Sequence, residues 1–178
     1  MPFKRFLTLC ALVLCAVNVP ALALEEVEYS TQSFTQSYVI PYIADFTKTP
    51  EGGVAWELLA KTEEESYQDV NEAGIDIFGV KPVFPPDVKA LDGQEIVMQG
   101  YMFPLDPTEK QARFLFGPFP VDCPYHYHVG PALVIEAAAK EPMAFSFDPV
   151  TIRGTLTLVP LDLDFNIFYR MENVRLVK

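Results

Sequence analysis

Residues 150–159 read Val-Thr-Ile-Arg-Gly-Thr-Leu-Thr-Leu-Val, and no other stretch of the chain indicates the fold class so directly. Polar and apolar side chains alternate along it, as they do in a strand that buries one of its faces. Gly154 interrupts the alternation in the middle. A glycine inside a strand marks a bulge or a sharp coil, which a small closed barrel requires.

Four further segments share this pattern, and Gly100 interrupts the first of them as Gly154 does here. The segments are 95–103, 113–116, 132–138 and 168–176. Five strongly coiled strands, with a longer insertion between the second and the third, predict an all-β domain built as an OB-like five-stranded barrel. An open five-stranded sheet is the alternative.

The residues before the barrel predict a different organisation. Thr49-Pro50-Glu51 is typical of a helix start, so we expect one short helix that runs to about Lys61, with Glu63–Glu65 as its solvated end. Trp56 is expected to anchor this helix to the main domain. Residues 80–86 carry three prolines and form a connector. The predicted organisation is a signal peptide over 1–23, an N-terminal extension over 24–85 and the barrel over 86–178.

The first residues predict export. Lys4 and Arg5 precede an apolar stretch, and Ala21-Leu22-Ala23 is a small-x-small cleavage site, so the mature chain is expected to begin at Leu24. The apolar stretch is too short for a comfortable membrane span. We therefore expect a periplasmic protein with no membrane insertion after the signal is cleaved.

Charge narrows the classes of partner. Of 13 basic side chains the signal holds Lys4 and Arg5, so 11 remain against 24 acidic ones, a formal charge of −13 for the mature chain. Such a charge repels phosphate backbones, which disfavours nucleic acid as a partner. A protein partner in the cell envelope fits better.

The one cysteine and both histidines of the predicted mature chain lie within six residues, Cys123-Pro-Tyr-His126-Tyr-His128. One thiolate and two imidazoles form a reasonable ligand set for zinc or for copper(I). Cys123, His126 and His128 are therefore the predicted metal ligands. With a single mature cysteine, no internal disulfide can form.

The block from Phe84 to Leu105 contains the phrase Leu91-Asp-Gly followed by Gly100-Tyr-Met-Phe-Pro-Leu. With the cysteine motif behind it, this resembles a family of exported bacterial proteins that is catalogued as a domain of unknown function. Relatives carry a cysteine after the second strand, followed closely by a second cysteine or a histidine. Cys123 matches the first position and His126 replaces the second cysteine. The resemblance covers about residues 80–178 and implies an OB-like fold, export, a site at this motif and an association with an envelope transport system.

Three functions remain open from the sequence. The first is a periplasmic binding or accessory protein that holds a transition metal in the 123–128 loop. The second is a metal-free adaptor in which that loop and the N-terminal extension contact other proteins. The third is a thiol-dependent enzyme that uses Cys123, which the absence of a resolving cysteine in the mature chain disfavours. Asp162 and Asp164 are expected to cap the turn before the last strand.

Overall fold

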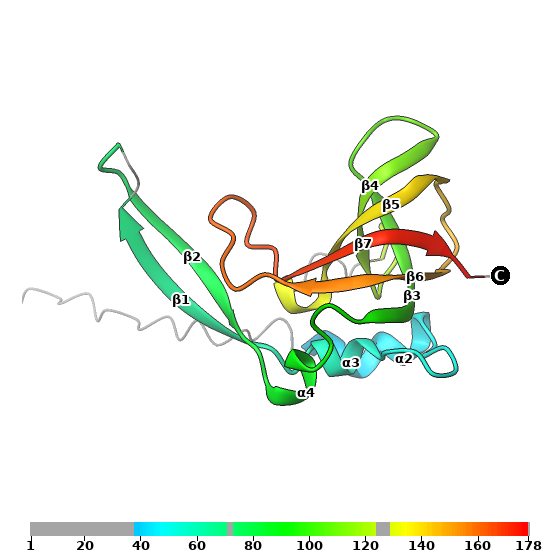
Figure 1. Ribbon diagram of the computed structural model, residues 1–178, viewed down its shortest axis with the longest axis horizontal. Helices are drawn as coiled ribbons and strands as arrows, with labels where there is room; N and C mark the ends of the chain where they lie inside the picture. The colour runs from blue at the N-terminus through cyan, green and yellow to red at the C-terminus, as the bar shows by residue number, and fades with distance from the viewer. Residues whose placement is uncertain (1–37, 71–72, 124–128, 178) are drawn as a thin grey trace, which may run out of the picture. The chain divides into compact units, whose positions relative to one another are not determined.

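The computed structural model describes residues 38–70, 73–123 and 129–177. Along the chain the elements are η1 (Ile40–Tyr42), α2 (Ile43–Phe46), α3 (Trp56–Leu59), β1 (Glu63–Val70), β2 (Asp76–Val83), α4 (Pro86–Lys89), β3 (Glu95–Pro104), β4 (Lys110–Gly117), η3 (Pro131–Leu133), β5 (Ile135–Ala144), β6 (Val150–Leu158) and β7 (Tyr169–Leu176) (Figure 1). No helix in these ranges is long and apolar enough to cross a membrane.

Strands β3 to β7 close into a barrel in the order β3-β4-β5-β7-β6 (Figure 1). Neighbouring strands are antiparallel except β5 and β7, which run parallel. The predicted all-β class and the five-stranded barrel are therefore confirmed, and the open sheet is not found. The five predicted strand segments all overlap β3 to β7, although β5 begins three residues later than expected.

Two glycines allow the barrel to turn its corners. Gly100 is the residue at which β3 stops pairing with β6 and begins to pair with β4. A Cβ atom at this position would lie 2.7 Å from the carbonyl oxygen of Gly117. Gly154 lies where the pairing of β6 with β7 shifts its register. Both glycines thus mark the irregularities that the sequence predicted.

The barrel core includes residues from the N-terminal extension. Its largest buried side chains are aromatic, and Trp56 from α3 packs on Phe116 with the ring centres 5.6 Å apart. The Trp56 indole Nε1–H also donates to the carbonyl oxygen of Gln99, at 2.7 Å. Trp56 therefore anchors the extension to the barrel, as predicted, and completes the hydrophobic core at the same time.

The helix predicted from Thr49 to Lys61 is much shorter in the structure. Only Trp56–Leu59 is helical, and the cap residue is Ala55. Residues 50–53 form a turn closed by a hydrogen bond from Gly53 N–H to the Pro50 carbonyl oxygen. The adjacent pair Gly52-Gly53 explains the difference, since Gly52 has a φ of +66° and glycine is a poor helix former.

The extension also contains a β-hairpin that the sequence analysis did not predict. Strands β1 and β2 pair along their whole length as a separate two-stranded sheet, from Glu63 opposite Val83 to Val70 opposite Asp76. The expectation that Glu63–Glu65 end a helix is therefore wrong. Most side chains of the hairpin are exposed or half-buried.

Candidate functional site

Cys123 is the one predicted metal ligand that the structure describes. It lies in a turn after β4, where its N–H donates to the carbonyl oxygen of Pro120 at 3.1 Å. The residue is 6% exposed and belongs to the hydrophobic core. His126 and His128 lie outside the described residues, and within the described ranges no group of metal-binding side chains gathers.

The surroundings of Cys123 link this turn to other parts of the barrel. Tyr101 on β3 donates a hydrogen bond to the carbonyl oxygen of Phe46, at 3.2 Å. Burial raises the pKa of Tyr101, and the negative charges of Asp148 and Asp122 raise it further. Cys123 therefore lies on a well-packed side of the barrel, near the end of α2 and the β5–β6 loop.

A small apolar cleft adjoins the same region. It has a volume of about 200 Å³, and its walls include Phe103, Leu115, Pro118 and Val129. Sites for small molecules usually measure about 300–1,000 Å³ and offer a few polar groups for orientation. This cleft is smaller and almost wholly apolar, so it is a poor candidate for a substrate site.

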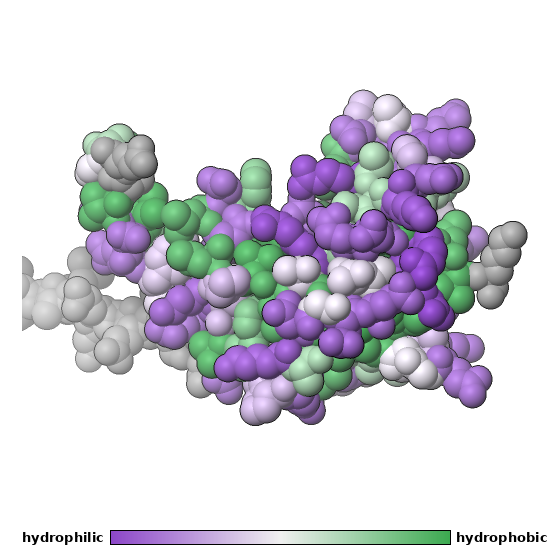
Figure 2. Space-filling view, viewed as in Figure 1, coloured by the Kyte–Doolittle hydropathy of each residue, from purple (hydrophilic) through white to green (hydrophobic). Residues whose placement is uncertain are grey.

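Of the eleven large hydrophobic side chains that are exposed among the described residues, seven lie elsewhere, on the hairpin and on the β6–β7 loop. We call six of these residues the hairpin–loop surface: Val70, Ile75, Phe78, Leu161, Leu163 and Phe165, since Val83 lies on the other face of the hairpin. Phe78 is 71% exposed and Phe165 is 77% exposed. Figure 2 shows hydrophobic side chains over the hairpin, with hydrophilic groups between them. Exposed apolar groups rimmed by polar ones are typical of protein-interaction sites.

The base of the hairpin is clamped on Tyr169 of β7. The Tyr169 hydroxyl donates to the Leu59 carbonyl oxygen at 3.0 Å and lies 2.5 Å from the Thr62 hydroxyl, just before β1. Phe84, just after β2, packs on the Tyr169 ring with centres 5.8 Å apart. Burial raises the pKa of Tyr169, so its hydroxyl stays protonated. Both ends of the hairpin are thus fixed to the barrel.

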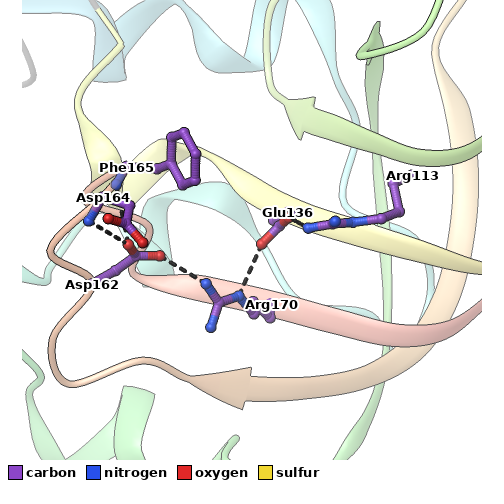
Figure 3. Close-up of polar contacts among 6 residues, drawn as sticks. All are labelled: Arg113, Glu136, Asp162, Asp164, Phe165 and Arg170. Carbon is purple, nitrogen blue, oxygen red and sulfur yellow. Dashed lines mark hydrogen bonds and ion pairs between the residues drawn. The ribbon is translucent and has the colours of Figure 1, made fainter.

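The β6–β7 loop is fixed by a network of charged side chains (Figure 3). Arg170 bridges Glu136 on β5 and Asp162 in the loop, through contacts of 2.8 and 2.7 Å, and Arg113 also pairs with Glu136. Asp162 Oδ1 accepts the N–H groups of Asp164 and Phe165 at 3.1 and 3.0 Å. The predicted capping role is thereby confirmed for Asp162. Figure 3 shows the Phe165 ring pointing away from this network.

The loop also binds the hairpin directly. Asn166 has a φ of 54°, a left-handed conformation that asparagine tolerates better than most residues. Its Oδ1 accepts the N–H of Val80 on β2, at 3.1 Å. The two parts of the hairpin–loop surface are therefore held together by a hydrogen bond and to the barrel by buried contacts.

A second cleft lies beside the charged network, with a volume of about 340 Å³ and walls formed by Arg113, Glu136, Ala138, Arg170 and Glu172. Both carboxylate oxygens of Glu136 already form ion pairs, one with Arg113 and the other with Arg170. A charged ligand would have to break one of these ion pairs to enter. The network is therefore better explained as support for the loop.

The hairpin–loop surface was not predicted from the sequence. The acidic run Glu63–Glu65 was expected to be a solvated helix end, and residues 161–165 were expected only to form a turn. The available signal was the sequence Leu-Asp-Leu-Asp-Phe itself, in which three large apolar residues lie in a loop bounded by strands. Apolar residues that alternate with aspartates in a loop belong to no sheet and so have no buried face on which to pack. Their side chains are therefore expected to be exposed.

Comparisons with known proteins complete the description of the site. Neither a scan against protein-family models nor a search of curated proteins gives a match. Among solved structures, the chain is similar to the crystal structure of a DUF3299 family protein from Pseudomonas aeruginosa, with 23% sequence identity and a TM-score of 0.41. That likeness covers 56% of this chain and 68% of the other. The similar protein itself belongs to a family named as a domain of unknown function, and at this level of similarity no residue role passes from it to this chain.

Proposed function

We propose that this protein is an exported accessory protein of the cell envelope, and that it works by binding a protein partner through the hairpin–loop surface. The observation that carries the proposal is that large apolar side chains are exposed on elements that are themselves anchored to the barrel. Phe78 and Phe165 are largely exposed, yet the elements that carry them are anchored through Tyr169, Asn166 and Asp162. Rigid aromatic anchors bind a partner at a low cost in conformational entropy.

The proposal agrees in part with the adaptor function inferred from the sequence, in which the 123–128 loop and the N-terminal extension contact other proteins. The hairpin belongs to that extension, whereas the loop in the proposed surface is the one between β6 and β7. A periplasmic location is part of the proposal and depends on the predicted signal peptide at residues 1–23. N-terminal sequencing of the secreted material should give Leu24 as the first residue. A start that is blocked by a lipid would contradict export in this form.

Photo-cross-linking in living cells tests the binding function. A photoreactive amino acid would replace Phe78, Phe165 or, as a matched control, Phe147, which is 76% exposed in the β5–β6 loop. Phe147 and Phe165 lie beyond opposite ends of β6, roughly 27 Å apart along a strand of this length. We expect the photoreactive groups at positions 78 and 165 to cross-link to the same partner protein, which mass spectrometry of the two adducts identifies. The same adduct at Phe147, or none at the other two positions, would overturn the proposal.

Metal binding by Cys123, His126 and His128 is a second candidate, and the fixed position of Cys123 favours it. Its backbone is held by Pro120 and its side chain by the core, which would give a metal one preplaced sulfur ligand. Zinc and copper(I) are the ions that such a ligand set suits. Thiol catalysis is less well supported, because a sulfur buried to this degree is hard for a substrate to reach.

Competitive titration with zinc and with copper(I) tests the second candidate. Because Cys123→Ser places a hydroxyl in the core, His126→Ala and His128→Ala are the more informative variants. We expect His126→Ala to weaken binding about tenfold or more while the circular dichroism spectrum stays unchanged. Affinity should also fall as the pH drops below about 6.5, where imidazole becomes protonated. Equal affinity in wild type and both histidine variants would exclude a site at this motif.

A further inference from the structure

The charge of the hairpin indicates the chemistry of its partner. Residues 63–83 hold six acidic side chains and a single basic one, Lys81, a net charge of −5. Lys81 pairs with Glu65 at 3.0 Å, so its charge is already compensated within the hairpin. The exposed apolar residues Val70, Ile75 and Phe78 therefore lie within a strongly negative field.

One face of the hairpin carries Phe78 and Val70 together with the acidic residues Glu64 and Asp76. In the β1–β2 register Glu64 lies opposite Pro82, Gln68 opposite Phe78 and Val70 opposite Asp76. Side chains two residues apart point to the same face of a strand, so Glu64, Phe78 and Val70 share one face. Glu64 and the pair Gln68–Phe78 are separated by about 13 Å along it.

Glu64 supplies a second observation. One of its carboxylate oxygens, Oε1, is shielded from solvent and has no hydrogen-bond partner among the described residues. The partial burial raises the pKa of Glu64 above its usual value. A shielded carboxylate without a donor is unfavourable, and a cationic side chain brought by a partner would compensate for it.

We infer that the hairpin–loop surface receives a segment of a partner protein that carries basic and apolar side chains on one face. The inference rests on the proposed function and adds the partner's chemistry. Apolar groups of the segment pack on Phe78 and Phe165, while its lysine or arginine side chains meet Glu64 and the neighbouring acidic residues. Such a combination gives contact area from the aromatic rings and rapid, selective encounter from the charges.

Two other occupants fit less well. A second copy of this chain would bring the same acidic hairpin to a symmetric contact, where like charges repel. The surface of an anionic membrane would likewise repel a hairpin of charge −5. The negative field therefore favours a basic protein segment over both.

Calorimetric titration of the full mature chain with designed peptides tests the inference. The probe is a nine-residue peptide. Lysine and leucine alternate at its odd positions, and serine occupies its even positions. In one control peptide serine replaces leucine, and in the other glutamate replaces lysine. We expect both controls to bind at least about tenfold more weakly than the probe, and the affinity for the probe to fall as salt is added.

Protein variants locate the binding on the surface. Phe78→Ser and Glu64→Gln should each weaken binding of the probe, by about fivefold or more for the first and severalfold for the second. Phe147→Ser should leave the affinity unchanged, since Phe147 has the same side chain and a similar exposure but lies in the β5–β6 loop. Circular dichroism on each variant checks that the fold is retained.

Several results would overturn the inference. One is the absence of binding to the probe at about 1 mM, and another is equal binding of the serine control peptide. An unchanged affinity for the probe in Phe78→Ser, or tighter binding to anionic vesicles than to the probe, would do the same. Concentration-dependent dimers that Phe78→Ser abolishes would assign the surface to self-association. A cross-linked partner whose contacting segment is acidic would leave the proposed function intact and contradict only its chemistry.

Discussion

The barrel and the hairpin use the same secondary structure for opposite purposes. In the barrel the inward side chains of β3 to β7 are buried, and aromatic rings such as Phe114 and Phe116 have no exposed surface. In the hairpin the two strands pair equally well, but Phe78 is largely exposed and shares its face with the acidic residues Glu64 and Asp76. Strand pairing alone therefore does not indicate where a core lies. What separates the two regions is whether the sheet closes on itself, because only closure gives the apolar side chains a shared interior.

The same substitution in both regions should give the largest contrast. Phe114→Ala removes a fully buried ring, so we expect it to lower the free energy of unfolding by about 3–5 kcal/mol. Phe78→Ala removes an exposed ring and should change that free energy by less than about 0.5 kcal/mol. Chemical denaturation followed by circular dichroism measures both. Similar losses in the two variants would mean that the hairpin is part of the stabilising core.

Replacing a glycine by alanine should also lower the free energy of unfolding more in the barrel than in the hairpin, with a smaller difference between the two regions. At Gly100 the new Cβ would meet the Gly117 backbone oxygen at 2.7 Å and the buried ring of Phe116 at 2.8 Å, so we expect a loss of about 1–3 kcal/mol. At Gly79 the nearest atoms to the new Cβ would be the ring and hydroxyl of Tyr67, a half-buried side chain that can change its rotamer. The loss there should be below about 1 kcal/mol. A larger loss at Gly79 than at Gly100 would contradict the assignment of the barrel corner.

The ionisation of Glu64 in the hairpin should make the free energy of unfolding depend on pH. Its pKa is raised in the folded state by burial, so folding favours the protonated form. Ionised Glu64 therefore weakens the fold at neutral pH, and this penalty is relieved as the pH falls through the raised pKa towards 4.5. Glu64→Gln should stabilise the protein slightly at pH 7 and make no difference below pH 4.5. Denaturation curves at both pH values check this, and a stabilisation that persists unchanged in acid would show that the charge is not its cause.

The sequence predicted the barrel well because burial of one face leaves a period of two in the residue pattern. The strands around Gly100 and Gly154 were recognised, and the two glycines lie where β3 changes its pairing partner and where the pairing of β6 with β7 shifts register. The hairpin lacks that pattern. Its first strand begins Glu-Glu-Glu, and acidic residues are depleted in strands, while no buried face forces the rest to alternate. Its register depends on pairing with β2 and on the clamp at Tyr169, which are contacts distant in sequence.

The candidate sites differ in the same way. Cys123, His126 and His128 could be proposed from spacing alone, because ligands close in sequence can reach one ion. The hairpin–loop surface could not, since it joins residues 70–78 to residues 161–165 through the bond from Val80 to Asn166. That contact arises only after the barrel has placed the end of β6 beside the hairpin. Surfaces assembled from distant segments leave little trace in a single sequence.

The most direct test of the division between a stabilising barrel and a binding hairpin is the yield of the cross-linked adduct from a photoreactive group at Phe165. That yield should be compared, in cells, between chains that also carry Phe78→Ser and chains that carry Phe147→Ser. Both substitutions remove an exposed ring, so protein levels should match. We predict that Phe78→Ser lowers the yield at least about fivefold and that Phe147→Ser leaves it unchanged. Equal yields in the two variants would contradict the claim that the hairpin–loop surface binds the partner.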